Sequence, residues 1–313
     1  MPTYDHILTA VAATPWAMEV EFGRAVAAIL SARVAGRENH EGVSVAQAAA
    51  AAREKRKMKA RPKNVAVVPL YGMMTPRADF FTETSGLLSV EQVGQMVDAA
   101  AADPAVDAIV LDIDSPGGSV FGTAELGGKV AAAAAQKKTI AVANHLAASG
   151  AFWVGSQASE FVVSPSAMVG SVGVYLMHVD ESEALKAGGV AVTYVASSPE
   201  KVSGASEKPL DATGRAEMER VVADYYAEFV RAVAKGRGVS QAKVREDFGR
   251  GGVVTAADAV SRGMADRVAS LDDVLSRFGV APGDGARADV TIAPAAADDR
   301  GAVEVRRRRL RMG

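Results

Sequence analysis

The residue most suited to nucleophilic chemistry is Ser149, at the junction of a predicted strand and a predicted helix. The strand ends at Asn144, and the small-residue run Ala-Ala-Ser-Gly-Ala at 147–151 follows. Small neighbours leave room for a substrate backbone, and the dipole at a helix N-terminus favours negative charge there. The plainer interpretation is that the Ser149 hydroxyl only caps the helix. The pattern therefore offers Ser149 as a nucleophile or as an N-cap.

A glycine-rich turn supplies candidate backbone donors. The sequence Ser-Pro-Gly-Gly-Ser at 115–119 ends an apolar run and opens a predicted helix. Glycine lets a substrate carbonyl approach closely, and free N–H groups at such a turn can stabilise an oxyanion. An ordinary tight turn between a strand and a helix has the same composition. The turn is therefore a candidate oxyanion site whose alternative is purely structural.

Two further residues could act on Ser149 if the fold brings them close. Ser171 lies 22 residues after Ser149, between Gly170 and Gly173, which interrupt a β-like stretch. Glycines in a strand indicate close approach of another backbone, although Ser171 could simply pack in a sheet. Lys201 follows a predicted strand in Pro-Glu-Lys-Val-Ser-Gly, where most lysines lie on the surface. It gains chemical interest only if it is buried beside Ser149.

The composition excludes several kinds of site. The chain has 313 residues and no cysteine, so disulfides, thiolate zinc sites and a cysteine nucleophile are excluded. The histidines show no metal-binding spacing such as HExxH, and we expect no metal and no organic cofactor. The net charge of −2 provides no global basic field for nucleic acid. No apolar run approaches the roughly 18 residues of a membrane span, and the N-terminus has no basic start, so we expect a cytoplasmic protein.

The elements that must position these residues alternate between strand and helix from residue 64 onward. The predicted strands are 64–72, 107–118, 139–144, 161–164, 168–177 and 190–197. The predicted helices are 89–102, 121–137, 149–157, 181–187, 212–236, 240–247, 255–262 and 270–277. Such alternation predicts right-handed β-α-β crossovers and a largely parallel sheet, hence an α/β fold.

Three regions are expected along the chain. Residues 1–62 are predicted to form a helical arm, because the apolar residues of 17–35 fit a helical stripe. The basic run at 53–61 is interpreted as a solvated face or linker, with a nucleic-acid contact as the alternative. Residues 63–278 form the α/β domain. Residues 279–313, rich in Ala, Pro, Gly and Asp and ending in an arginine cluster, are predicted to be a flexible tail.

The order of four motifs resembles that of a known family. The motifs are SPGGS, AASGAFW, VGSVGV and a lysine in a loop after a strand, and they span about residues 64–275. This order resembles the signal peptide peptidase A family of serine peptidases, which has the Clp-protease/crotonase fold. The Thr-Pro-Trp-Ala at 14–17 and the His-Val-Asp at 178–180 resemble its phage branch, the capsid-assembly (prohead) proteases. The lysine loop at 201–210 also resembles that branch, although Pro-Glu precedes the lysine where relatives more often carry Ala-His.

The resemblance implies a Ser-Lys dyad. Ser149 matches the nucleophile, Lys201 the general base, and Ser171 the serine that positions the lysine. The N–H of Gly118 matches an oxyanion donor, with the N–H of Gly150 as a candidate second donor. Because burial disfavours the ammonium form, we expect the lysine to be shielded, in part by a neighbouring subunit or by substrate. A Ser-His pair with His145 or His178 is the mechanistic rival.

The function that follows is a serine endopeptidase that works through an acyl-enzyme. The phage-like motifs predict polypeptide substrates such as capsid, scaffold or portal proteins, processed during prohead assembly in the host cytoplasm or in the prohead. We expect a ring-like homo-oligomer with no specific nucleic-acid partner. The alternatives are a bacterial cytoplasmic protein-degrading peptidase, a crotonase-type acyl-CoA enzyme and a catalytically inactive assembly factor. The complete set of four motifs favours an enzyme over an inactive factor.

Overall fold

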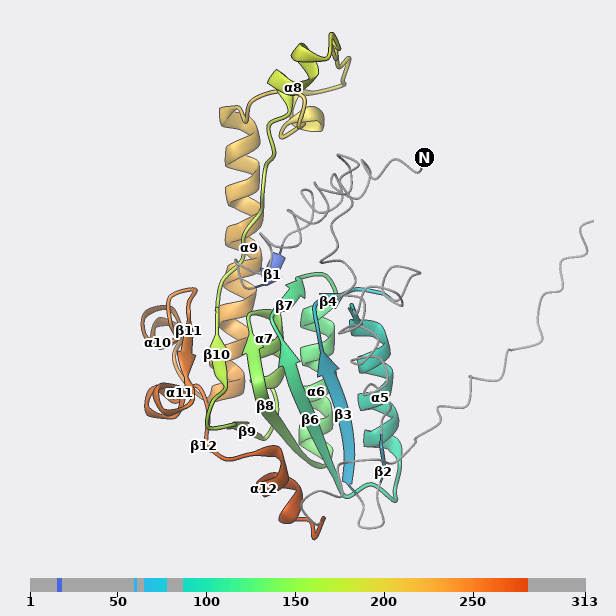
Figure 1. Ribbon diagram of the computed structural model, residues 1–313, viewed down its shortest axis with the longest axis vertical. Coiled ribbons are helices and arrows are strands. Elements are labelled where there is room, and N and C mark those ends of the chain that lie inside the picture. The colour runs from blue at the N-terminus through green and yellow to red at the C-terminus, as the bar shows by residue number, and fades with distance from the viewer. Residues whose placement is uncertain (1–15, 19–58, 61–64, 78–86, 281–313) are drawn as a thin grey trace, which may run out of the picture.

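The computed structural model describes residues 16–18, 59–60, 65–77 and 87–280 (Figure 1). Most of the predicted helical arm and the predicted tail beyond residue 280 lie outside the described residues. Within the described part of the chain, no helix combines the length and the apolar character that crossing a membrane requires.

A largely parallel sheet forms the centre of the structure. Its main strands are β3 (Val65–Tyr71), β6 (Ala108–Ser115), β8 (Lys138–Ala148) and β10 (Met168–Gly170). They lie in the order β10-β8-β6-β3, and each pairs in parallel with its neighbour. Antiparallel strands flank this group, namely β11 (Val253–Thr255) beside β10 and β2 (Lys59–Ala60) beside β3. The parallel strands β9 (Glu160–Val163) and β12 (Arg267–Val268) extend it beside β8. The predicted α/β class with a largely parallel sheet is confirmed.

Both faces of the sheet are apolar, because other parts of the chain cover both sides, as is usual for parallel strands. Alternate residues of β3 and β6 belong to two separate apolar clusters. Residues of six helices complete the larger cluster: α5 (Val90–Ala102), α6 (Thr123–Gln136), α7 (Gly150–Gly155), α9 (Ala212–Arg237), α10 (Gln241–Asp247) and α11 (Ala256–Arg262). The short helix α12 (Leu271–Ser276) covers part of the other face. Alternating apolar residues thus fix which face each strand presents to each helical layer.

A second, small sheet stands beyond the carboxyl ends of the parallel strands. Its order is β1 (Trp16–Met18), β7 (Gly117–Ser119), β4 (Met74–Thr75) and β5 (Leu88–Ser89). β4 follows β3 after a turn, and β7 follows β6 almost directly. Gly118 is required here, because a Cβ at this position would lie 2.0 Å from the carbonyl oxygen of Met74. The close approach of two backbones therefore explains the glycine of the SPGGS turn.

After β10 the chain leaves the sheet and forms a long projection. Residues 176–211 make up this projecting arm, which contains α8 (Ser182–Ala187) and the 3₁₀ helix η1 (Pro199–Val202). α9 returns the chain to the core, and Figure 1 shows α8 at the end of α9 that lies far from the sheet. The last turns of α9 bury their apolar side chains, and the ring of Phe229 stacks on that of Trp153 at 4.7 Å. The chain then continues through α10 (Gln241–Asp247) and α11 (Ala256–Arg262).

Several predicted elements are wrong in type or length. Only 168–170 of the predicted strand 168–177 is a strand, and 190–197 forms no strand. The second segment lies on the projecting arm, where the described residues supply no neighbouring strand to complete a hydrogen-bonded ladder. Residues 17–18 and 59–60, expected to be helical, are strands paired with β7 and β3. Pairing with open sheet edges overrides their local helical pattern. The predicted helices from residue 89 onward are confirmed, with ends shifted by one or two residues.

Candidate active site

Ser149 lies in a strained turn between β8 and α7. Its backbone has φ 53° and ψ −119°, the mirror image of an ordinary turn conformation and one that residues other than glycine rarely adopt. Two backbone hydrogen bonds hold it: its N–H donates to the Gly170 carbonyl at 2.7 Å, and its carbonyl accepts from the Trp153 N–H at 2.9 Å. Strain of this kind costs about 1–3 kcal/mol and concentrates at functional sites. A sharp strand-to-helix turn is also the geometry that presents the nucleophilic serine in α/β-hydrolases.

The Ser149 side chain does not cap the helix that it precedes. It occupies the N-cap position of α7 but makes no capping hydrogen bond. Its hydroxyl instead donates to the Gly173 carbonyl over a long 3.4 Å, and the residue is fully buried. The simple N-cap interpretation is therefore wrong, and the hydroxyl is held by one weak interaction that a substrate or a base could replace.

Ser171 lies beside Ser149 because β10 is the parallel neighbour of β8. The register places Gly170 opposite Ala148, so the two serines leave adjacent strands at the same level. Ser171 also has a positive φ, 54°, and its N–H donates to the Gly252 carbonyl at 2.7 Å. The tertiary structure thus brings together two serines that are 22 residues apart in the sequence.

The candidate oxyanion donors also gather at this end of the sheet. β7, which carries Gly118, packs against α7, and Gly150 is the first residue of α7. The N–H groups in the first turn of a helix have no acceptor within the helix. The Ser115 hydroxyl fixes the glycine-rich turn, because it donates to the Gly72 carbonyl at 2.7 Å and accepts from the Gly117 N–H at 3.2 Å. The turn is therefore ordered before any ligand binds.

Lys201 lies away from Ser149 of the same chain. It is exposed, in η1 on the projecting arm, where Gly204 packs against Gly214 in the first turn of α9. Phe229 comes fifteen residues after Gly214 in α9. Its ring stacks on that of Trp153, which lies about one turn after Ser149. At 1.5 Å per residue, these two levels of α9 are about 22 Å apart. One chain therefore does not assemble the predicted Ser-Lys pair.

Neither candidate histidine contacts Ser149 in the described part of the chain. His145 is exposed on β8, and its Nδ1 lies 3.2 Å from Oδ2 of Asp114. His178 lies on the projecting arm, with Nε2 3.3 Å from the Ala205 carbonyl oxygen. The geometry of this chain thus gives no support to a Ser-His pair.

A buried polar network beneath the site was missed by the sequence analysis. Tyr71 donates its hydroxyl to Asp112, and Asn144 donates to the same carboxylate at 3.2 Å. Ser164 in turn donates to the Asn144 side chain at 3.4 Å. Burial raises the pKa of Asp112, while the hydrogen bonds from Tyr71 and Asn144 act in the opposite direction. The network ties β3, β6 and β8 together near their carboxyl ends, and an aspartate inside the apolar run AIVLDI was its only sequence signal.

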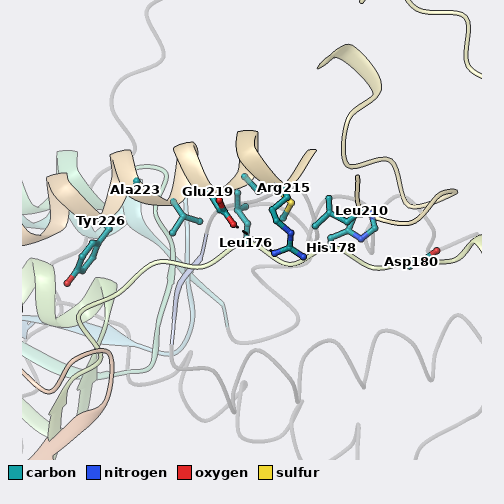
Figure 2. Close-up of a pocket in the computed structure, with 10 residues that line it drawn as sticks. Leu176, His178, Asp180, Leu210, Arg215, Glu219, Ala223 and Tyr226 are labelled. Carbon is teal, nitrogen blue, oxygen red and sulfur yellow. Dashed lines mark ion pairs between the residues drawn. The ribbon is translucent and has the colours of Figure 1, made fainter. Parts of the chain in front are cut away.

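A groove of about 630 Å³ lies on the projecting arm rather than at Ser149. Figure 2 shows its side chains in a row between the extended segment that carries Leu176 and His178 and the first half of α9. The residues that line it are Leu176, His178, Asp180, Leu210, Arg215, Met218, Glu219, Val222, Ala223 and Tyr226. Among the described residues, no three His, Asp or Glu side chains gather as metal ligands would.

Two curated relatives of this chain are named as proteases. The chain is 28% identical over 212 residues to the capsid assembly protease C of Escherichia phage lambda, covering 68% of this chain and 48% of that protein. It is 30% identical over 196 residues to protease 4 of Salmonella typhi, covering 62% of this chain and 31% of that protein. The chain thus spans less than half the length of these curated relatives. A solved structure, that of a mutant of the 1510-N membrane-bound stomatin-specific protease, is 15% identical with a TM-score of 0.45, covering 72% of this chain and 92% of that one.

The matching family covers the segment that contains the candidate nucleophile. Residues 131–281 match Peptidase family S49, and this range includes Ser149, Ser171 and Lys201. A match to a peptidase family disfavours the crotonase-type acyl-CoA alternative. This part of the chain is therefore similar to peptidase family S49, in agreement with the names of the two protease relatives.

Proposed function

We propose that the protein is a serine endopeptidase with Ser149 as its nucleophile. The observation that carries this proposal is the strained, uncapped Ser149 directly before Gly150 at the start of α7, the helix against which β7 and its Gly118 pack. Its Oγ bonds to the peptide carbonyl carbon, and its proton passes to a base and then to the leaving amine. Water later hydrolyses the resulting ester and restores the serine. The N–H groups of Gly118 and Gly150 stabilise the oxyanion formed in each step.

The base in this proposal is Lys201 of a second copy of the chain. Lys201 is exposed on an arm that carries it roughly 20 Å from Ser149 of its own chain, given the rise of α9 between the two levels. The same arm exposes large apolar side chains, which are unusual on the surface of a protein that works alone. They are Val179, Val190, Val192, Tyr194 and Val195. Packing of arms between copies would cover these residues and the groove of Figure 2, and it would desolvate the amine, which favours its neutral form.

Mixing two inactive variants tests this arrangement. Ser149→Ala keeps the lysine and Lys201→Ala keeps the serine, and each variant alone is expected to be inactive. When the two are dissociated and reassembled together, random assortment pairs an intact serine with an intact lysine at about a quarter of the sites. Recovery of peptide hydrolysis to that level supports a base supplied by another copy. No recovery, with oligomers verified by light scattering, would contradict it.

The proposed substrates are structural proteins of a phage particle, processed in the host cytoplasm or in the prohead. This follows from the similarity to a protein named a capsid assembly protease, and capsid, scaffold and portal proteins are the partners to examine. Degradation of cytoplasmic peptides, by similarity to protease 4, is the alternative. Mass spectrometry after co-expression with neighbouring structural genes separates the two, with Ser149→Ala as the control. Specific cleavage of a structural protein supports the first function, and its absence supports the second.

A further inference from the structure

The strand β1 fills a narrow position between two segments of the chain. On one side it pairs antiparallel with β7, so that Ala17 lies opposite Gly118. On the other side Trp16 and Tyr175 exchange backbone hydrogen bonds, of 3.0 Å from the Trp16 N–H and 3.1 Å from the Tyr175 N–H. A short stretch of chain from near the N-terminus is therefore hydrogen-bonded along both edges.

The two segments that hold β1 are also the two that flank Ser149. β7 carries Gly118, the candidate oxyanion donor, and packs on α7. The other segment carries Gly173, whose carbonyl accepts the Ser149 hydroxyl, two residues before Tyr175. An extended peptide reaches a recessed site by adding a strand to an open sheet edge. The edge of β7 beside Ser149 is such an edge, and β1 already occupies it.

Two further observations indicate that this occupied position is closed. Trp16 is 6% exposed and packs in a small apolar cluster with Met73, Leu87 and Tyr175, so the strand has a side-chain anchor as well as backbone bonds. Ser149 itself has no exposed surface while β1 is in place. A segment attached to the same chain also competes at an effective concentration of about millimolar, which favours it over dilute peptides.

We propose that β1 is a tethered substrate mimic that occupies the peptide-binding edge beside Ser149 and must be displaced before a polypeptide binds. The proposal rests on the proposed peptidase function, because it assigns the edge of β7 to peptide substrates. Backbone pairing is largely independent of sequence, so an unfolded polypeptide at sufficient concentration can replace β1. The N-terminal segment would then restrict activity to substrates that are locally abundant, as they are inside an assembling particle.

A reversible cross-link provides the test. The chain has no cysteine, so Trp16→Cys with Ser119→Cys introduces a single pair at positions that face each other across β1 and β7. Facing residues of antiparallel strands have Cα atoms about 4.5–5.5 Å apart, within the range that a disulfide spans. Oxidation locks β1 in place, and reduction releases it without its tryptophan anchor. The Ser119→Cys single variant, treated in the same way, is the matched control.

Binding is measured first, in a Ser149→Ala background that cannot cut the probe. The probe is fluorescein-labelled unfolded casein, followed by fluorescence anisotropy. We expect the reduced protein to bind at least about tenfold more tightly than the oxidised one, and the single variant to be unaffected by oxidation. Equal binding in both redox states would overturn the proposal, and so would the absence of binding in both.

Hydrolysis by the protein with Ser149 intact separates this proposal from the proposed function. If β1 blocks the edge, Trp16→Ala lowers the KM for an extended peptide and leaves kcat nearly unchanged. A parent protein that hydrolyses no peptide argues against the peptidase function. The casein-binding measurement still tests whether β1 occupies the peptide-binding edge. Hydrolysis that is unchanged by oxidation of the cysteine pair overturns the role of β1 and leaves the peptidase function standing.

Discussion

Replacing Ser149 with glycine is expected to stabilise the protein while it abolishes peptide hydrolysis. The reason is the backbone conformation of Ser149, φ 53° and ψ −119°, which glycine adopts without the steric cost that a Cβ atom adds. A serine in such a conformation stores about 1–3 kcal/mol of strain. Glycine offsets about 0.5–1 kcal/mol of the stability gained, because it gives the unfolded chain more conformational freedom. The lost hydroxyl removes only the long contact with the Gly173 carbonyl.

The net gain is about 1 kcal/mol, which corresponds to about 2–4 °C in Tm for a domain of this size. Thermal unfolding followed by circular dichroism measures it, alongside hydrolysis of an extended peptide. Ser149→Ala is the first control, because it removes the hydroxyl but keeps the strain. Arg250→Gly is a second comparison for strain alone, because Arg250 also has a positive φ, 48°, and an exposed side chain, so its change should stabilise the protein as well. A Ser149→Gly protein no more stable than Ser149→Ala would refute the argument from strain.

Three other expectations follow from particular contacts. Gly118→Ala should lower Tm by more than about 5 °C and disrupt β7, because the added Cβ would meet the Met74 backbone. Gly128→Ala should instead stabilise the protein by about 1 kcal/mol, because Gly128 lies in α6 with open space around it. Thermal unfolding of the two variants compares these effects. Lys201→Ala and Lys201→Arg should both abolish hydrolysis of an extended peptide without changing the Tm of the separate chain, because the side chain is exposed there and a guanidinium stays protonated. Full activity in either variant would contradict a lysine base. Burial opposes ionisation of Glu160, but hydrogen bonds from Arg277, Arg267 and Lys138 hold its pKa at about 2 against an ordinary 4.5. Glu160→Gln should therefore lower the free energy of unfolding in urea by about 1 kcal/mol at pH 7. The difference from the parent protein should vanish as the pH falls from 4.5 towards 2, because the carboxylate becomes protonated.

The sequence by itself determined the elements whose signals are local. The apolar runs of β3, β6 and β8 are long enough and rich enough in branched residues to be buried strands in any arrangement. Local signals also predicted the alanine-rich helices, the junction of β8 with α7 and the position of Ser149 at that junction. The glycines at 170 and 173 also indicated close approach of another backbone, and a Cβ at Gly170 would lie 2.8 Å from the Gly252 carbonyl oxygen. In each case the information lies within about ten neighbouring residues.

Only the tertiary structure decided which of these elements meet. The order of strands placed Ser171 beside Ser149, because β10 became the parallel neighbour of β8, and no local pattern encodes that choice. The pattern at 190–197 is that of a strand, but a strand requires a partner, and the arm carries these residues away from the sheet. Trp16 belongs to a segment that was predicted to be helical, but in the structure it forms a strand paired with the edge of β7. Hydrogen-bond partners and buried neighbours distant in the sequence determined these outcomes, including the separation of Lys201 from Ser149 within one chain.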